Sequence, residues 1–357
     1  MEKYIFVLGR DPELSLLELT SFFESRNIDF KIEYRDNYFV VASLDRFDFS
    51  IEEFGGIIKI AKVILESSDN EEVEFELNKI NFDFDNKFRY GVSGDEFLRD
   101  YFKERFKQDG LRAYIKNDVS RPSDSLKLGF EIIKVKSFIG KIIQVSNPKE
   151  YKKRDEKRPR FDEKKVISIR LAKILINISK AKNEILDPFC GTGTILQEGL
   201  LKNFNVIGLD KDISDAEDNL RWFTKNFNVK NNYKLIKGDA AKLSSYINKI
   251  EAVVTEPYLG PFMRENYNKI MALKLKKELN ELYKAFLFEL SKIVLGNVVF
   301  IAPVFKVGKS FIKLDIEDIL KETRFKVLKS KYVKMPVVYR PDKTRLIREI
   351  WVLESFK

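Results

Sequence analysis

The stretch Asn183-Glu-Ile-Leu-Asp-Pro-Phe-Cys-Gly-Thr-Gly-Thr-Ile-Leu-Gln-Glu198 decides the fold. A short apolar run ends in Asp187, two glycines follow at Gly191 and Gly193, and helical spacing begins at Thr194. This order predicts a strand, a tight glycine turn and a helix N-terminus. Because glycine has no Cβ, such a turn exposes backbone N–H groups to a ligand.

The residues around the turn indicate which ligand it suits. Position 196 is Leu196, so the third glycine of a dinucleotide-binding fingerprint is missing. Asp187, directly before the turn, would repel a pyrophosphate. That carboxylate suits a ligand with a positive centre and an amine, such as S-adenosylmethionine.

Strand-like and helix-like segments alternate after this stretch. The alternation predicts an α/β domain with a parallel, doubly wound sheet. Residues 325–339 and 345–356 form two long strand patterns joined by Pro341-Asp-Lys-Thr, so we expect an antiparallel hairpin at or near an edge of the sheet. Further strands are expected at 184–187, 205–210, 233–238, 252–255 and 298–302, and helices at 166–178, 194–202, 214–227 and 270–292.

The N-terminal half has a different organisation. Residues 1–70 follow a β-α-β-β order, with a helix at 12–25, which predicts a small ferredoxin-like α+β unit. The polar stretch 67–76 is expected to be a linker or an edge strand. Residues 71–147 predict a second small α+β unit.

A basic connector, residues 148–165, precedes the domain expected at 166–357. From Lys149 to Lys165 it holds nine Lys or Arg against five Asp or Glu. One interpretation is a solvated charged linker. The other is an ordered connector whose cations, Lys152, Lys153, Arg154 and Arg158, contact phosphates.

Composition excludes several kinds of site. The chain has 357 residues, no histidine and a single cysteine, so imidazole triads, cysteine–histidine metal sites and internal disulfides are ruled out, and no metal is expected. A net charge of +10 is compatible with a polyanionic partner, or with a lysine-rich composition set by genome bias. No membrane span or signal peptide is apparent, which predicts an intracellular, cytoplasmic protein.

Four strand ends carry polar residues in the order expected for a nucleoside site. Asp187 opens the glycine turn, Asp210 ends a strand 23 residues later, and Asp239 follows the next strand. The spacing suits Asp210 to ribose hydroxyls, and Asp239 could accept from an adenine amino group. A single aspartate after a strand is more often a helix cap, but four such ends in order favour a nucleoside cofactor.

The fourth strand end, Thr255-Glu256-Pro257-Tyr258, is the candidate reactive turn. A rigid proline turn can present oxygens toward an amino group while Tyr258 stacks on a flat base. Acceptors that take the hydrogens of an exocyclic amine favour the geometry in which its lone pair attacks a methyl group. This chemistry needs no strong base. The alternative is a proline-stabilised surface turn.

These motifs resemble the class I S-adenosylmethionine-dependent amino-methyltransferases. The whole-chain layout resembles the THUMP-containing tRNA guanine-N2 methyltransferases, which modify guanosine 10. The resemblance implies cofactor contacts for Asp187, Phe189, Gly191, Gly193, Asp210 and Asp239, and catalytic roles for Thr255, Glu256, Pro257 and Tyr258. It also implies a Rossmann-like C-terminal domain preceded by ferredoxin-like and THUMP-like units that hold the tRNA.

The reactive turn departs from the family pattern. The family begins this turn with Asp or Asn followed by proline, whereas this chain has Thr255 and Glu256. Thr255 can accept a hydrogen bond through its hydroxyl, and Glu256 offers a carboxylate from the next position. Two alternatives stay open: a DNA or rRNA amino-methyltransferase, and a non-catalytic RNA-binding protein with a relict fold. A small activator subunit as partner also stays open.

Overall fold

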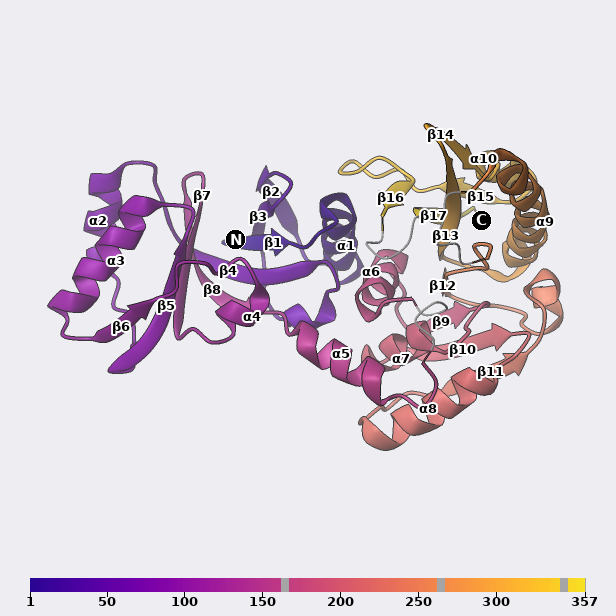
Figure 1. Ribbon diagram of the computed structural model, residues 1–357, viewed down its shortest axis with the longest axis horizontal. Coiled ribbons are helices and arrows are strands. Elements are labelled where there is room, and N and C mark those ends of the chain that lie inside the picture. Colours follow the sequence, from indigo (N-terminus) through magenta and orange to yellow (C-terminus); the bar gives the residue numbers. More distant parts are fainter. Residues whose placement is uncertain (162–166, 262–266, 341–345, 357) are drawn as a thin grey trace. The chain divides into compact units, whose positions relative to one another are not determined.

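The computed structural model describes residues 1–161, 167–261, 267–340 and 346–356 (Figure 1). Contacts divide the chain into two compact units. Unit 1 comprises Met1–Pro12 and Asn27–Lys152, and unit 2 comprises Glu13–Arg26 and Lys153–Lys357. Each unit is built on its own β-sheet.

The sheet of unit 1 has eight strands in the order β2-β3-β1-β4-β8-β7-β5-β6. Its pairings are antiparallel except for β5 with β6 and β5 with β7, which are parallel. The strands are β1 (Glu2–Leu8), β2 (Phe30–Arg35), β3 (Phe39–Leu44), β4 (Ile57–Glu66), β5 (Lys87–Ser93), β6 (Arg112–Ile115), β7 (Phe130–Val135) and β8 (Phe138–Val145). Strands from both sides of residue 70 join this one sheet, so the sheet does not separate the two small units expected on either side of that residue. The division at residue 70 stays a prediction.

Unit 1 also contains the short helix η1 (Ile51–Glu53) and the helices α2 (Asn70–Lys79), α3 (Glu96–Gln108) and α4 (Pro122–Ser125). The expectation of a linker or edge strand at 67–76 was wrong, because α2 occupies most of it. Asp69 caps the helix by accepting a 2.9 Å hydrogen bond from the Glu72 backbone N–H. Val73 and Leu77, one turn apart, are buried on the same face. The polar residues between Val73 and Leu77 hid this helical spacing in the sequence.

The sheet of unit 2 confirms the doubly wound prediction. Its main path runs β11-β10-β9-β12-β13-β17-β15, and the first five strands are parallel (Figure 1). The last strand, β17, is antiparallel to β13 and lies close to the edge formed by β15. The strands are β9 (Glu184–Asp187), β10 (Asn205–Asp210), β11 (Tyr233–Lys237), β12 (Ala252–Thr255), β13 (Asn297–Val307), β14 (Ser310–Lys313), β15 (Phe325–Val327), β16 (Val337–Tyr339) and β17 (Ile347–Ser355).

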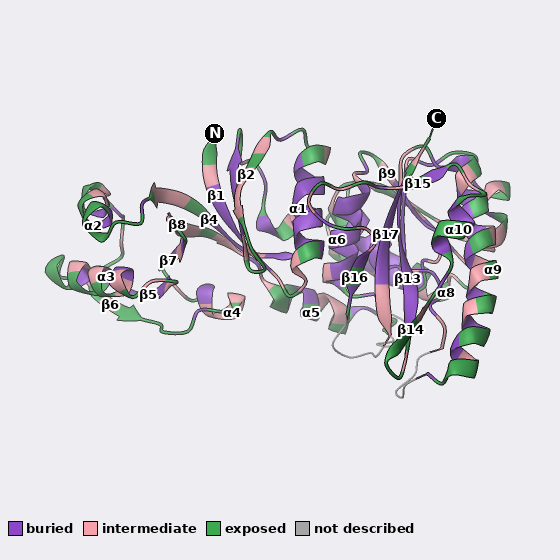
Figure 2. Cartoon of the chain, turned by 90° about the horizontal axis from the view of Figure 1, so that it is seen from above, coloured by how far each residue is buried: buried purple, intermediate pink, exposed green. Residues whose placement is uncertain are grey.

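Helices cover both faces of this sheet because strand side chains alternate between them. On β10, Val206 packs with the residues of α7 and α8, whereas Leu209 packs with those of α9. The strands β13 and β17 are buried along most of their length (Figure 2). The helices of unit 2 are α6 (Ile169–Ser179), α7 (Thr194–Leu201), α8 (Ser214–Asn226), η2 (Ala240–Ser245), α9 (Lys269–Ile293) and α10 (Ile316–Leu320).

The long strand expected at 325–339 was wrong. It is two short strands, β15 and β16, which both pair with β17. Between them, the Ser330 hydroxyl accepts hydrogen bonds from the Tyr332 and Val333 backbone N–H groups at 3.1 and 3.3 Å. This local serine turn withdraws the backbone from the sheet. The connection expected at Pro341-Asp-Lys-Thr lies outside the described residues.

Two helices lie in segments for which the sequence predicted a different place in the domain organisation. Helix α1 (Pro12–Ser25), expected within the ferredoxin-like unit, belongs from Glu13 onward to unit 2. There its buried Glu18 accepts a 2.7 Å hydrogen bond from the Asn177 amide. The connector forms helix α5 (Pro148–Lys157), an ordered segment in which Tyr151 is buried and most other residues are exposed, so both interpretations of its cations stay predictions over these residues.

Candidate active site

The glycine turn, residues 188–193, joins β9 to α7 in the predicted order. Gly191 and Gly193 have φ angles of +48° and +81°, which side chains on L-residues rarely tolerate. The Gly193 N–H closes the turn by donating to the Cys190 carbonyl at 2.7 Å. Among the described residues, other than its two chain neighbours, a Cβ placed on Gly191 would meet no atom within 4 Å. The space beside Gly191 is therefore open to the approach of a ligand.

Asp210 holds this turn from the neighbouring strand. One of its carboxylate oxygens, Oδ2, accepts a 2.9 Å hydrogen bond from the Gly191 N–H. The contact follows from the parallel pairing of β10 with β9, in which Gly208 lies opposite Asp187. Each carboxylate oxygen can accept more than one hydrogen bond. Asp210, which is only partly buried, therefore retains capacity for a ligand's hydroxyl groups.

Asp187 is buried at the end of β9, with only 2% of its surface exposed. Its Oδ1 accepts a 2.6 Å hydrogen bond from the Thr255 hydroxyl and a 3.2 Å bond from the Phe189 N–H. Burial raises the pKa of the Asp187 carboxyl to about 7, although both hydrogen bonds act in the opposite direction. Asp187 therefore titrates near neutral pH, and a positive charge beside it would favour the ionised form.

The reactive turn is tethered by a residue of the C-terminal strand. Oε1 of Glu256 lies 2.9 Å from Nη2 of Arg348 on β17, and the two side chains are 14% and 17% exposed. Burial raises the pKa of Glu256, and Arg348 opposes that rise. Pro257 is buried, whereas Tyr258 is 56% exposed. The turn thus directs its carboxylate into the protein and its tyrosine ring toward solvent.

Asp239 follows β11 and acts as the N-cap of η2. Its Oδ1 accepts a 3.0 Å hydrogen bond from the Ala241 N–H, and its Oδ2 lies 3.2 Å from the Lys211 ammonium. The bond from Ala241 and the neighbouring Lys211 lower the pKa of the Asp239 carboxyl. Asp239 is therefore ionised and partly exposed, beside the end of the neighbouring strand β10.

The structure brings the predicted strand ends together. The strands that carry them are adjacent and parallel in the order β11-β10-β9-β12, so their carboxyl ends share one edge of the sheet (Figure 1). Phe189 packs edge-on against Phe286 of α9, with ring centroids 5.1 Å apart. Its ring is therefore part of the core below the turn. The ligand contacts of all these residues stay predictions.

Two residues at this edge were not expected from the sequence. Arg348 meets Glu256, and Asn219 of α8 donates a 2.9 Å hydrogen bond to the Thr192 carbonyl of the glycine turn. The available signal for Arg348 was a charged residue within an apolar strand pattern. No pattern in the sequence marked Asn219, because asparagine is common on helix surfaces. In the described part of the chain, no cluster of acidic or cysteine side chains could hold a metal ion.

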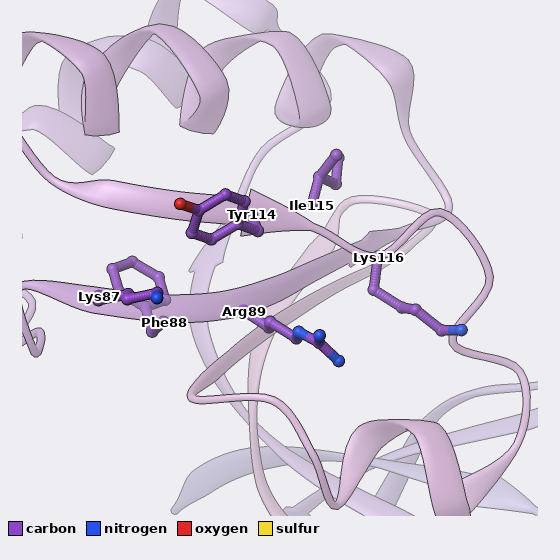
Figure 3. A pocket seen from close by; sticks show the side chains of 6 residues that line it. All are labelled: Lys87, Phe88, Arg89, Tyr114, Ile115 and Lys116. Carbon is purple, nitrogen blue, oxygen red and sulfur yellow. The ribbon is translucent and has the colours of Figure 1, made fainter.

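A second feature is a basic pocket in unit 1. Its volume is about 640 Å³, and it lies along the parallel strands β5 and β6 (Figure 3). Exposed cationic side chains and an exposed tyrosine line it together with two apolar residues: Lys87, Phe88, Arg89, Tyr114, Ile115 and Lys116. Lys116 also lies 3.5 Å from Asp124. The pocket offers positive charge next to a flat aromatic ring.

Comparisons with known proteins agree with this architecture. The chain is 26% identical over 320 residues to a tRNA (guanine(10)-N2)-dimethyltransferase of Pyrococcus abyssi, covering 84% of this chain and 88% of the relative. It is 22% identical over 284 residues to the enzyme of that name from Methanocaldococcus jannaschii, covering 71% and 80%. The resemblance to the tRNA guanine-N2 methyltransferases is thereby confirmed.

Solved structures support the fold. The crystal structure of TrmN from Thermus thermophilus matches with a TM-score of 0.54 at 15% identity, covering 99% of this chain and all of that one. A possible methylase from Clostridium difficile matches with a TM-score of 0.52 at 15% identity, covering 100% and 98%. Among the described helices, none is both long and apolar enough to cross a bilayer. The family model for the RMKL-like methyltransferase domain matches residues 156–335, half of the sequence, and the chain belongs to that family.

Proposed function

We propose that this chain is an S-adenosylmethionine-dependent methyltransferase that methylates the exocyclic N2 amine of a guanine, guanosine 10, in tRNA. Support comes from the relatives that carry this activity in their names and align along most of the chain. The observation that carries the proposal is the 2.6 Å contact between Thr255 and Asp187. It joins the reactive turn to the glycine turn at the edge where doubly wound sheets bind ligands.

The residues at this edge fit S-adenosylmethionine. The open space at Gly191 admits a nucleoside close to the backbone of the turn. Asp210 would accept from the ribose hydroxyls and Asp239 from the adenine amino group. Asp187, ionised by a neighbouring positive charge, would face the cationic end of the molecule. When bound, this cofactor supplies the methyl group from its sulfonium.

The reactive turn orients the target base. An exocyclic amine is a weak nucleophile because its lone pair is delocalised into the ring. The Thr255 hydroxyl is buried and donates to Asp187, so the carbonyl oxygens of the turn are the acceptors left for the amine. The exposed ring of Tyr258 offers a surface for stacking the base. Positioning and electrostatics thus replace the general base that a chain without histidine lacks.

The basic pocket of unit 1 supplies a surface for the RNA. Lys87, Arg89 and Lys116 provide positive charge for phosphates, and Tyr114 provides a ring on which an unpaired base can stack. Changing the three cations to Gln should weaken tRNA binding and reduce the slope of its salt dependence by about three. The exposed Lys103 and Lys107 of α3 are matched controls in the same unit. Equal slopes for both sets of variants would remove the pocket from the RNA-binding surface.

The activity is tested with labelled S-adenosylmethionine and unmodified transcripts of tRNA, rRNA and duplex DNA. We expect label in tRNA alone, recovered after digestion as an N2-methylated guanosine at position 10. Nucleoside mass spectrometry of tRNA from a deletion strain should show the loss of that nucleoside. Label confined to rRNA or DNA would establish the alternative amino-methyltransferase. Activity that needs added cell extract would indicate the activator subunit.

Two variants separate an enzyme from a non-catalytic RNA-binding protein. Asp187→Ala and Tyr258→Ala should abolish methyl transfer while circular dichroism shows a folded chain. Full activity in both variants would exclude the site. Calorimetry with S-adenosylhomocysteine addresses the relict fold directly. Retained tRNA binding without any nucleoside binding by the wild-type chain would favour that alternative.

A further inference from the structure

Residues 153–160 of the connector, called here the connector segment, belong to unit 2, and two of their arginines contact helix α7 of that unit. Nη1 of Arg154 lies 2.9 Å from Oε1 of Glu198 on α7, and both side chains are largely buried. Nη1 of Arg158 donates a 2.9 Å hydrogen bond to the Thr194 hydroxyl, and its Nη2 lies 2.6 Å from Asp155. Arg158 is only 5% exposed. Because the Arg158 guanidinium is buried and paired with these groups, it stabilises contacts inside unit 2 and is not available to bind a phosphate.

Asn219 joins the same segment to the glycine turn. Its amide is fully buried on α8 and donates 2.9 Å hydrogen bonds to the carbonyls of Arg160 and Thr192. Its Oδ1 accepts a 2.9 Å bond from the Arg160 N–H. Both donors and one acceptor site of the amide are therefore used. One side chain thus fixes the connector backbone and the turn backbone to each other.

Together these contacts hold the turn on both sides of Gly193. Asn219 binds Thr192 before it, and Arg158 binds Thr194 after it. Glycine has more backbone freedom than any other residue, so a turn containing Gly191 and Gly193 would sample many conformations without such support. Restraining the turn before the ligand arrives reduces the entropy lost on binding.

We propose that Arg158 and Asn219 are positioning residues that hold the glycine turn in the conformation that binds the nucleoside cofactor. They act through Thr192 and Thr194. The inference rests on the proposed S-adenosylmethionine site and adds to it the connector segment, which the sequence had assigned either to solvent or to phosphates. Arg154, paired with Glu198 one turn further along α7, anchors the same segment.

The test measures S-adenosylhomocysteine binding by calorimetry for Arg158→Met and Asn219→Ala in the full chain. We expect the Kd to rise at least tenfold in each variant. Hydrogen exchange of peptides covering residues 188–197 should become faster in the ligand-free protein. Arg158→Lys, which keeps one donor for Thr194, should recover part of the affinity. If Asn219→Ala does not fold, Arg158→Met carries the test.

Matched controls come from the same segment and the same helix. Arg160→Ala removes an exposed side chain but keeps the backbone groups that bind Asn219, and Arg221→Ala removes an exposed cation paired with Glu217 on α8. Both should bind S-adenosylhomocysteine like the wild type. Arg158→Met and Thr194→Val should have less than additive effects, because each removes the same hydrogen bond.

Unchanged affinity and unchanged exchange in Arg158→Met would overturn the inference. Faster exchange throughout unit 2, with no preference for residues 188–197, would also overturn it, because the role would then be general stability. A wild-type chain that binds no S-adenosylhomocysteine would instead contradict the proposed function. In that case hydrogen exchange of residues 188–197 in the ligand-free variants still decides whether Arg158 and Asn219 restrain the glycine turn.

Discussion

The Thr255 hydroxyl donates a 2.6 Å hydrogen bond to the Asp187 carboxylate, and neither side chain is open to solvent. Thr255 ends β12 and Asp187 ends β9, and these two strands pair in parallel. The contact links the turn expected to hold the cofactor to the turn expected to hold the base. The first position of the reactive turn therefore acts on Asp187.

Replacing Thr255 by Val keeps the side-chain shape and removes the donor. Because this hydrogen bond lowers the pKa of Asp187, its loss should raise that pKa further. The pH at which the methyl-transfer rate rises should then shift upward. Folding stability should fall by about 1–2 kcal/mol. A pH–rate profile and a denaturant titration check both effects. Thr224→Val, which removes a hydroxyl bonded to the Leu220 carbonyl on α8, should leave the profile in place.

Asp187→Asn should stabilise the ligand-free protein at alkaline pH. Burial raises the pKa of Asp187 from 3.8 to about 7, so the folded state holds this proton more tightly than the unfolded chain. The contribution of this proton to the free energy of unfolding is fully present below about pH 4 and is lost as the pH rises through about 7. An uncharged amide avoids that loss. The Tm should therefore rise more at pH 8 than at pH 5, while S-adenosylhomocysteine binding weakens.

The control for this variant is Asp318→Asn, which changes an exposed carboxylate on α10. Its effect on Tm should be small at both pH values. A Tm of Asp187→Asn that changes equally at pH 5 and pH 8 would show that Asp187 does not titrate in this range.

Arg348→Met should destabilise the chain by roughly 3 kcal/mol, because it leaves the largely buried Glu256 carboxylate without its counter-charge. Glu256→Gln in the same chain should restore most of that loss, since the amide carries no charge. Chemical denaturation of the two single variants and the double variant measures the coupling. Additive losses would mean that the two residues do not stabilise each other. We also expect kcat to fall in Arg348→Met, because the reactive turn loses its tether.

Gly191→Ala separates backbone strain from ligand contact. Gly191 and Gly308 both have positive φ angles, +48° and +57°, and at either position a Cβ would have no atom of the described chain within 4 Å beyond the two neighbouring residues. Alanine at each should therefore lower stability by a similar amount, about 1 kcal/mol. Only Gly191→Ala should weaken S-adenosylhomocysteine binding, because its methyl group would occupy ligand space. Calorimetry and thermal melts of both variants make the comparison. Equal affinities would place the ligand away from Gly191.

The sequence by itself determined the strand–turn–helix around Asp187 and the order of the strand-end residues Asp210, Asp239 and Thr255. These features follow from local patterns, namely an apolar run, two glycines and the start of helical spacing. In a doubly wound sheet that order places the strand ends on one edge. Helix α2 escaped the same reasoning because only two buried residues marked its face.

Only the tertiary structure decided which side chains meet. Thr255 and Asp187 lie 68 residues apart in the chain, and their contact depends on β12 pairing with β9. The approach of Arg348 to Glu256 likewise depends on β17 joining the sheet beside β13. One of the two interpretations of the connector had Arg158 contact phosphates, but the fold buries this side chain against Thr194. Charge can be read from a sequence, but burial and partners follow from strand order and packing, which no local pattern contains.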